Sequence, residues 1–187
     1  MRTISTIVDD AEMTPELEET FGNIQEQLGA PFVPNFFKVW AHAPEALNGI
    51  FPAMKHILAS GKLDRKLKEM IFVAVSSLKD SSYCGAAHKA FCMSMGVSED
   101  QLSGLIQDYT SNNLDPKDKA AIDFAVKLAK DPKVSTENDF KHLSEFGFST
   151  EEVMELMAAS AMAVFYDHLA DSTGINIDEG FLKKASA

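Results

Sequence analysis

Two stretches of the chain that lie 51 residues apart share half of their residues. LDRKLKEMIFVAVSSLKD at 63–80 aligns with LDPKDKAAIDFAVKLAKD at 114–131, with identity at 9 of 18 positions. At the same offset, GVSED from Gly96 falls on GFSTE from Gly147. Both stretches have helical periodicity, so we expect an all-α helical bundle in which one helical unit occurs twice, at about 63–102 and about 114–153.

Caps and prolines set the expected boundaries of the first helices. Thr14 is a suitable N-cap for a helix that Gly29 would end. A short aromatic helix is expected around 36–42, because the prolines before it bend the chain. A longer helix is expected over 44–59, kinked or restarted at Pro52.

The first copy of the repeat contains a core helix and a helix that carries reactive side chains. The core helix has one apolar stripe, formed by Leu67, Met70, Ile71, Ala74, Val75 and Leu78. After it, Ser81 or Ser82 can cap a helix that ends at Gly96 and carries Cys84 and His88.

Composition limits the function classes. The 187 residues, 45% of them hydrophobic, can bury one substantial core, so a single domain over 1–187 is expected. With 28 acidic and 17 basic side chains the net charge is −11, which makes nucleic acid and anionic membranes poor partners. The N-terminus lacks the apolar segment of a secretory signal and no apolar run could span a bilayer, which indicates a soluble cytoplasmic protein.

No cofactor or metal is expected. The chain has no glycine-rich phosphate loop, and the histidines other than His88 (His42, His56, His142 and His168) lack the mutual spacing of metal ligands. Asp167, His168 and Asp171 share one helical surface, which is interpreted as exposed or as a subunit contact. Nine Met and thirteen Phe indicate an adaptable core, part of which could line an apolar pocket.

Cys84 and His88 have the spacing of a thiol and its proton carrier. Residues four apart share one face of a helix, and Cys84 would lie in the first turn, where the helix dipole favours an anion. Both effects would lower the pKa of the thiol and raise the fraction of thiolate, the nucleophilic form. The alternative is an ordinary packed helix that happens to contain Cys and His.

Glu69 and Cys92 bear on this alternative. Glu69 lies beside the apolar stripe of the core helix, where a carboxylate usually has a partner, and His88 is the expected one. Cys92 would lie roughly 12 Å along the helix from Cys84, too far for a disulfide. The two cysteines are therefore expected to be separate thiols in a reducing compartment.

The spacing of Glu69, Ser81, Cys84 and His88 resembles that of the AhpD-like alkylhydroperoxidase group in the carboxymuconolactone decarboxylase superfamily. In that pattern a Glu is followed by two cysteines, separated by two residues, and then by a His; Ser81 stands at the first cysteine position. VPNFFKVWAHAPE, KDKAAIDFAVKLAKDP, FGFSTEEVMEL and FYDHLADSTGINID are similar to other segments of the family, so the resemblance covers about 29–178.

The resemblance implies a helical homo-oligomer that reduces an organic hydroperoxide, or exchanges with a small disulfide, at the expense of an external thiol or dithiol reductant protein. It also implies that Cys84 is the thiol coupled to His88, that Glu69 anchors the proton relay, and that Tyr83 lies between the two sulfur positions. A serine at position 81 cannot form the disulfide that resets a two-cysteine peroxidase.

Three interpretations of Ser81 stay open: an engineered Cys-to-Ser variant, a natural one-cysteine enzyme reset by an external thiol, or a paralogue with another role. Two rival functions stay open as well. One is a cofactor-free lactone decarboxylase-like enzyme, which would use the acid and base without sulfur. The other is a non-catalytic oligomeric binding or sensor protein.

Overall fold

The structure is a computed structural model that describes residues 6–9, 11–109 and 113–184. Over these residues the chain forms helices and no strand, which confirms the expected all-α class. The elements are α1 (Pro15–Leu28), α2 (Asn35–Trp40), α3 (Pro44–Leu58), α4 (Arg65–Lys79), α5 (Ser82–Ser94), α6 (Glu99–Asp108), α7 (Pro116–Lys130), the 3₁₀ turn η1 (Pro132–Val134), α8 (Glu137–Glu145), α9 (Thr150–Thr173) and α10 (Glu179–Lys184).

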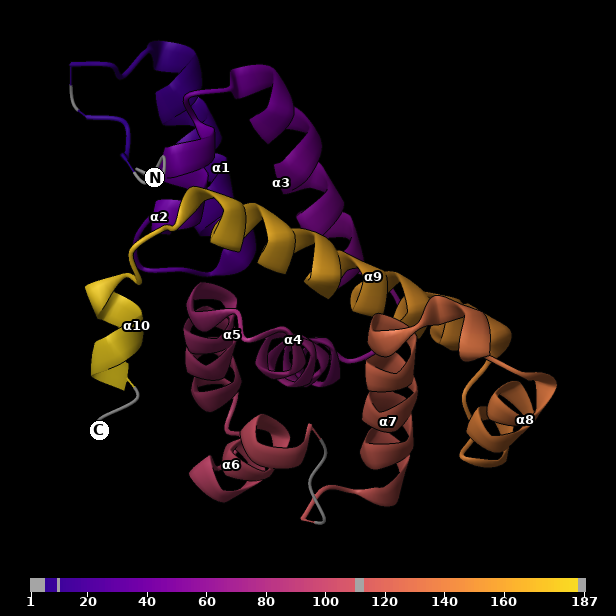
Figure 1. Ribbon diagram of the computed structural model, residues 1–187. Coiled ribbons are helices and arrows are strands. Elements are labelled where there is room, and N and C mark those ends of the chain that lie inside the picture. Colours follow the sequence, from indigo (N-terminus) through magenta and orange to yellow (C-terminus); the bar gives the residue numbers. More distant parts are fainter. Residues whose placement is uncertain (1–5, 10, 110–112, 185–187) are drawn as a thin grey trace.

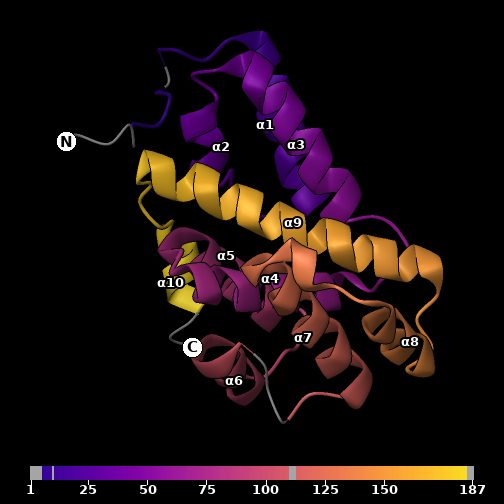
Figure 2. The same ribbon diagram turned by 45° about the vertical axis from the view of Figure 1, so that its right-hand side comes forward.

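Helix α4 lies at the centre of the bundle. In Figure 1 it is seen end-on, with α5 and α7 on either side, α9 above and α6 below, and it contacts all four. Helix α9 separates this group from the N-terminal helices, since α3 packs on its other side together with α1 (Figure 2). Glu69 on α4 and His88 on α5 therefore lie at a space that several helices enclose.

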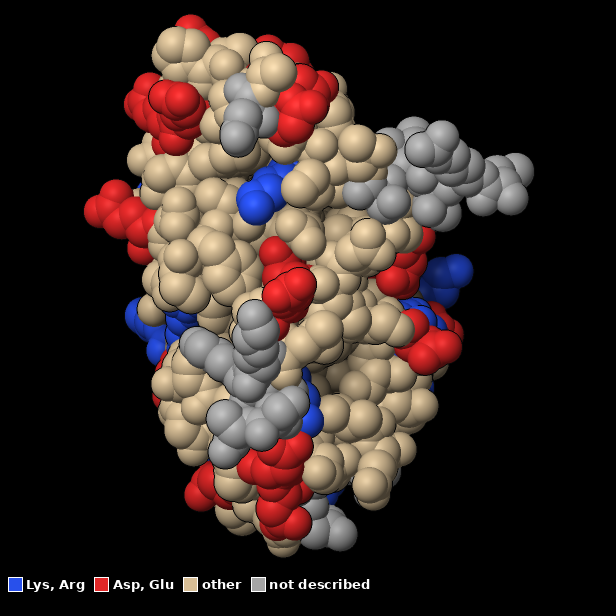
Figure 3. Space-filling model, turned by 90° about the vertical axis from the view of Figure 1, so that its left-hand side faces the viewer, with Lys and Arg blue, Asp and Glu red and all other residues tan. Residues whose placement is uncertain are grey.

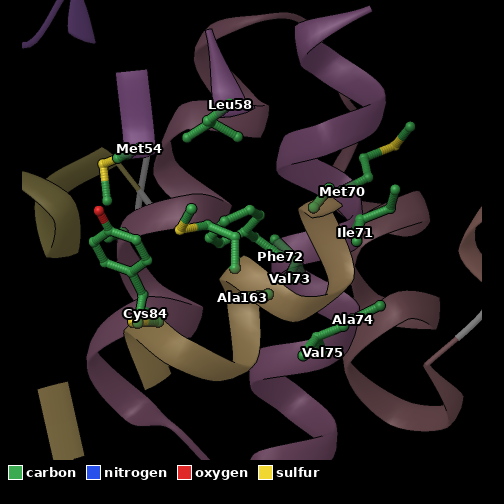
Figure 4. Packing of buried hydrophobic residues seen from close by; sticks show 14 of the residues in the cluster. Met54, Leu58, Met70, Ile71, Phe72, Val73, Ala74, Val75, Cys84 and Ala163 are labelled. Carbon is green, nitrogen blue, oxygen red and sulfur yellow. The ribbon is translucent and has the colours of Figure 1, made fainter. Parts of the chain in front are cut away.

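Because α4 lies at the centre, more of its surface is buried than the apolar stripe expected from the sequence. Every residue from Leu67 to Ser76 is buried, including Lys68 and Glu69. Figure 4 shows side chains of this helix packed with Ala163 of α9 and with Cys84 in one cluster. A single hydrophobic cluster includes residues from α1 to α10, and we infer that the chain forms one domain.

Buried Lys68 is satisfied by the loop before α4 and by α9. Its Nζ lies 2.8 Å from Oε2 of Glu155 and donates to the carbonyl oxygen of Ser60. The same carboxylate accepts backbone hydrogen bonds from Lys62 at 2.8 Å and Leu63 at 3.1 Å. Because each polar group has a partner, the lysine can lie inside the bundle while it connects α4 to α9.

The expected repeat is visible in the helix boundaries. Helices α4 and α7 both have 15 residues and begin after an aspartate N-cap, Asp64 or Asp115, whose side chain accepts from the backbone two residues on. Helices α6 and α9 both begin after a serine, Ser98 or Ser149, in a capping box. The copies differ between these points, where α5 of the first copy is replaced by η1 and α8.

The first helices follow their caps. Thr14 accepts a hydrogen bond from the backbone of Leu17, and Gly29 ends α1 with φ of 61°. Helix α2 is shorter at its C-terminal end than expected. The predicted restart at Pro52 is wrong, because α3 continues through this residue as one helix. None of the described helices is both long enough and apolar enough to cross a membrane.

Candidate active site

Helices α4 and α5 bring Glu69 and His88 into contact. Nδ1 of His88 lies 2.6 Å from Oε2 of Glu69, and both side chains are buried. The imidazole also lies against the ring of Phe72, with 4.3 Å between centroids. The structure therefore brings together the two side chains that the sequence paired, and their role in proton transfer stays a prediction.

Arg65 supplies the positive charge that buried Glu69 needs. Its Nε lies 3.3 Å from Oε1 of Glu69, one turn away on α4. Its guanidinium also donates to the carbonyl oxygen of Leu28 at 3.0 Å and lies 5.7 Å from the centre of the Phe91 ring. The sequence analysis missed Arg65, although its position four residues before Glu69 was a signal for a helical ion pair.

Cys84 lies in the first turn of α5 and is only 3% exposed. Burial, and after it the carboxylate of Asp167, raises the pKa of the Cys84 thiol well above its usual range. The predicted lowering of this pKa is therefore wrong for the structure described. The prediction considered the helix dipole and His88, and it could not include the burial of the thiol or the acidic side chains that α9 brings to it.

Ser81 is the N-cap residue of α5, but its side chain does not cap the helix. Its hydroxyl donates to Oδ1 of Asp171 on α9 at 2.9 Å. On the same helix, Asp167 is 2% exposed and accepts a hydrogen bond of 2.7 Å from the hydroxyl of Ser76. The interpretation of this part of α9 as a surface is wrong for Asp167, whereas His168 and Asp171 are exposed.

Tyr83 connects the start of α2 to the closing segment of the chain. Its hydroxyl donates to Oδ2 of Asp178 at 2.8 Å and accepts from the backbone of Phe36 at 3.0 Å. The carboxylate of Asp178 also accepts from the backbone of Asn35 at 3.0 Å. Burial, and then Asp178, raises the pKa of Tyr83. The tyrosine thus holds the start of α10 against the start of α2.

One narrow, mainly apolar cavity reaches Cys84, His88 and Glu69 together. Space that water can occupy in it amounts to about 30 Å³, enough for one or two molecules. Its walls come from α1 to α5, α9 and α10 and include Leu28, Pro34, Phe36, Phe37, Met54, Leu58, Arg65, Tyr83, Ala87, Phe91, Tyr166 and Phe181. Met54 and Leu58, which Figure 4 labels, come from α3. Small apolar molecules fit these walls best.

Cys92 lies on the same helix as Cys84 but outside this cavity. It is completely buried, and burial raises the pKa of its thiol. Both cysteines are free. Within the described residues, no three His, Cys, Asp or Glu side chains converge in a way that could hold a metal ion.

Comparison with known proteins gives one family and a set of similar structures. Residues 44–127 match the model of the carboxymuconolactone decarboxylase family. These residues include α4 and α5, and so include Glu69, Ser81, Cys84 and His88. A search of curated protein sequences found no match.

Two similar solved structures cover nearly the whole chain. An uncharacterized peroxidase-related protein from Ralstonia eutropha JMP134, described as an alkylhydroperoxidase AhpD core, is 25% identical with a TM-score of 0.86 over 97% of this chain and 95% of its own. A second peroxidase-related protein, from Silicibacter sp. TM1040, is 24% identical with a TM-score of 0.83 over 96% and 95%.

A third similar structure is the debrominase Bmp8 in complex with 2,3,4-tribromopyrrole. It is 22% identical with a TM-score of 0.81 over 100% of this chain and 97% of its own, a likeness that shows the fold. The match over residues 44–127 and these folds confirm the resemblance found in the sequence: this region is similar to the carboxymuconolactone decarboxylase family, and the all-α fold of the chain is similar to that of AhpD-like proteins.

Proposed function

We propose that the protein is a thiol-dependent peroxidase that reduces hydroperoxides through Cys84. The observation that carries the proposal is the cavity that Cys84 shares with His88 and Glu69 between apolar walls. The family match and the peroxidase-related neighbours support an antioxidant role. In this proposal Cys84 is the nucleophile, His88 carries protons and Glu69 orients His88.

The reaction needs both the thiol and the acid–base pair. The sulfur of Cys84 attacks the terminal oxygen of the hydroperoxide, the O–O bond breaks, and Cys84 becomes a sulfenic acid. The leaving alkoxide takes a proton and departs as an alcohol. His88 is placed to give that proton, because Glu69 at 2.6 Å stabilises the imidazolium that precedes the transfer.

Ser81 and Cys92 decide how the sulfenic acid is reset. Ser81 has no sulfur to form a disulfide, and Cys92 is buried outside the cavity. We therefore propose that an external thiol, from a small molecule or a dithiol protein, attacks the sulfenic acid and returns Cys84 to its reduced form. Disulfide exchange with a small disulfide would use the same sulfur and the same external donor.

The apolar lining of the cavity favours an organic hydroperoxide with an apolar body. The walls provide aromatic and aliphatic side chains, while Arg65, Glu69 and His88 are the polar groups near the thiol. Because water has only about 30 Å³ of room there, a substrate larger than hydrogen peroxide has to displace wall side chains. Phe181 of α10 and Met54 of α3 are suitable to move, since α10 is short and Met is flexible.

One alternative is supported by a specific observation. A cofactor-free lactone decarboxylase-like enzyme would use Glu69 and His88 as the proton carriers and would need no thiolate. The raised pKa of the Cys84 thiol favours this alternative, as does the family whose model matches. A non-catalytic oligomeric binding or sensor protein is the remaining alternative.

The proposed context is a cytoplasmic homo-oligomer. Helix α9 exposes Met154 (59%) and Phe165 (45%), with Ala161 between them on the same side of the helix. A second copy that packs on this side would bury them. Light scattering measures the mass in solution, and Phe165→Glu would reduce it if this side forms the contact. Acidic side chains outnumber basic ones on the face that carries α10 (Figure 3).

The decisive experiment measures the rate at which Cys84 forms a sulfenic acid with an organic hydroperoxide. Cys92→Ala removes the second thiol, and His88→Ala is measured beside it. Oxidation that is faster than that of a free thiol and falls at least tenfold in His88→Ala supports the peroxidase. A rate equal to that of a free thiol in both would reject it and favour the decarboxylase alternative.

A further inference from the structure

Two carboxylates of α9 face the two positions of the thiol motif on α5. Asp171 accepts a hydrogen bond from the hydroxyl of Ser81, and Asp167, one turn earlier on α9, raises the pKa of the Cys84 thiol, one turn later on α5. Ser81 and Cys84 are themselves three residues apart. The motif is therefore bounded by acidic side chains on the side of α9, in addition to Glu69 and His88 on the side of α4.

The surroundings of Asp167 are those of a functional carboxylate and not those of a member of an ion pair. Its Oδ1 accepts from Ser76 at 2.7 Å, while Oδ2 is buried and has no well-formed hydrogen bond. No lysine or arginine forms a salt bridge with it among the described residues. Burial raises the pKa of Asp167 to about 6, although Ser76 and Cys84 act in the opposite direction. A buried carboxylate left in this state is typical of functional sites.

We propose that Asp167 is the base that takes the proton of the Cys84 thiol when the sulfur attacks its substrate. The proposal rests on the proposed role of Cys84 as the nucleophile. In the forward step the S–H proton moves to Asp167, the sulfur forms its new bond to oxygen, and His88 gives a proton to the alkoxide that leaves. The proton then returns from Asp167 to His88, so the site ends with the protons it began with.

Asp167 and His88 lie in different positions, and we therefore give them different tasks in the proposal. His88 has Nδ1 bound to Glu69 and lines the cavity into which the leaving oxygen would emerge. Asp167 does not line the cavity and approaches the thiol from α9. The titratable groups that face Asp167 are Cys84 and His88 from α5 and Asp171 from α9 itself. Asp171 is exposed and binds Ser81, whereas Asp167 is buried and has no salt bridge to a cationic side chain among the described residues.

The test is the rate of alkylation of Cys84 by iodoacetamide between pH 4.5 and 9.5, measured on the full chain with Cys92→Ala. If Asp167 acts as a base only when it is ionised, the rate of alkylation should rise with pH through about pH 6. This is well below the pKa of the thiol. In Asp167→Asn this rise disappears, and the rate at pH 7 falls at least tenfold. Asn keeps the size of the side chain and can still accept from Ser76.

Two further variants distinguish a base from a purely structural residue. Ser76→Ala removes a hydrogen bond that lowers the pKa of Asp167, so the rise should persist but move to higher pH. Asp171→Asn, which removes the partner of Ser81, should keep the rise. A structural role for Asp167 would predict similar losses at every pH.

Two results would overturn the proposal. If Asp167 acted on the thiol only through its charge, Asp167→Asn would lower the pKa of the thiol and react faster at pH 7. If the thiol stayed unreactive above pH 6 in the folded protein and reacted in the unfolded chain, the carboxylate would merely retain the proton. Slow oxidation by peroxide together with an intact rise near pH 6 would reject the peroxidase and leave this inference standing.

Discussion

Nδ1 of His88 and Oε2 of Glu69 lie 2.6 Å apart in a part of the core where both side chains are buried. This contact joins the first two helices of the repeated unit at the site where their sequence differs most from the second copy. At the corresponding positions the second copy has Ala120 and Asp139, and Asp139 instead caps α8 and binds Lys127. The contact between Glu69 and His88 thus belongs to one copy.

Glu69→Gln should slow the oxidation of Cys84 by about 10²-fold or more, because an amide keeps the contact with His88 but does not stabilise an imidazolium. Stopped-flow measurement with an organic hydroperoxide provides the rate. Asp139→Asn is the control, since it neutralises a carboxylate of the second copy, at the position that corresponds to His88. Equal rates in Glu69→Gln and the control would remove Glu69 from the mechanism.

Ser81→Cys should allow a disulfide between positions 81 and 84 after exposure to peroxide. Position 81 is buried next to Cys84, whereas the neighbouring Ser82 is exposed, so Ser82→Cys is the control. Mass spectrometry would detect the loss of two hydrogens and its reversal by a reductant. We expect turnover with a dithiol reductant in the first variant alone. A disulfide in both variants, or in neither, would contradict the proposed position of the sulfur pair.

Asp167→Asn should stabilise the protein at neutral pH. A carboxyl whose pKa is raised in the folded state destabilises that state as pH increases from its unfolded pKa through its folded pKa of about 6. The difference in unfolding free energy between variant and wild type should therefore grow from pH 4 to pH 6 and then level off, at up to about 3 kcal/mol. Urea unfolding at a series of pH values measures it. A difference that does not depend on pH would show that Asp167 has the same pKa in the folded and the unfolded chain and would contradict the raised value.

Tyr83→Phe should loosen α10 and destabilise the chain by about 1–3 kcal/mol, because the backbone N–H of Phe36 and the carboxylate of Asp178 lose a buried partner. Hydrogen exchange over 179–182 would report the change directly. Tyr109→Phe is the control, since Tyr109 meets Lys130 through its ring. Unchanged exchange in Tyr83→Phe would mean that other contacts hold α10.

The boundaries of the fold were largely predictable because they depend on local signals. Thr14, Gly29, Asp64 and Asp115 act within one turn of themselves, and the sequence shows such signals directly. The path of α3 was less predictable. Its continuation through Pro52 depends on packing against α1, α2, α4 and α9, and not on local propensity alone.

The site was predictable only in part for the same reason. The pair of Glu69 and His88 follows from helical spacing and from the family pattern, whereas Asp167 reaches Cys84 from a helix far along the chain. The helical surface that Asp167 shares with His168 and Asp171 looked polar in the sequence. Its burial depends on how α9 crosses α4 and α5, a tertiary arrangement that no local pattern records.

Part of the cavity wall is synthesised later than the helix that carries Cys84 and His88. Phe181 of α10 and Tyr166 of α9 form part of its wall, and both follow Cys84 and His88 by many residues. While α9 and α10 are still inside the ribosome, α5 has already emerged. It then lacks the side chains of α9 and α10 that later form part of the cavity wall. During synthesis Cys84 therefore emerges before the helices that complete its burial in the folded chain.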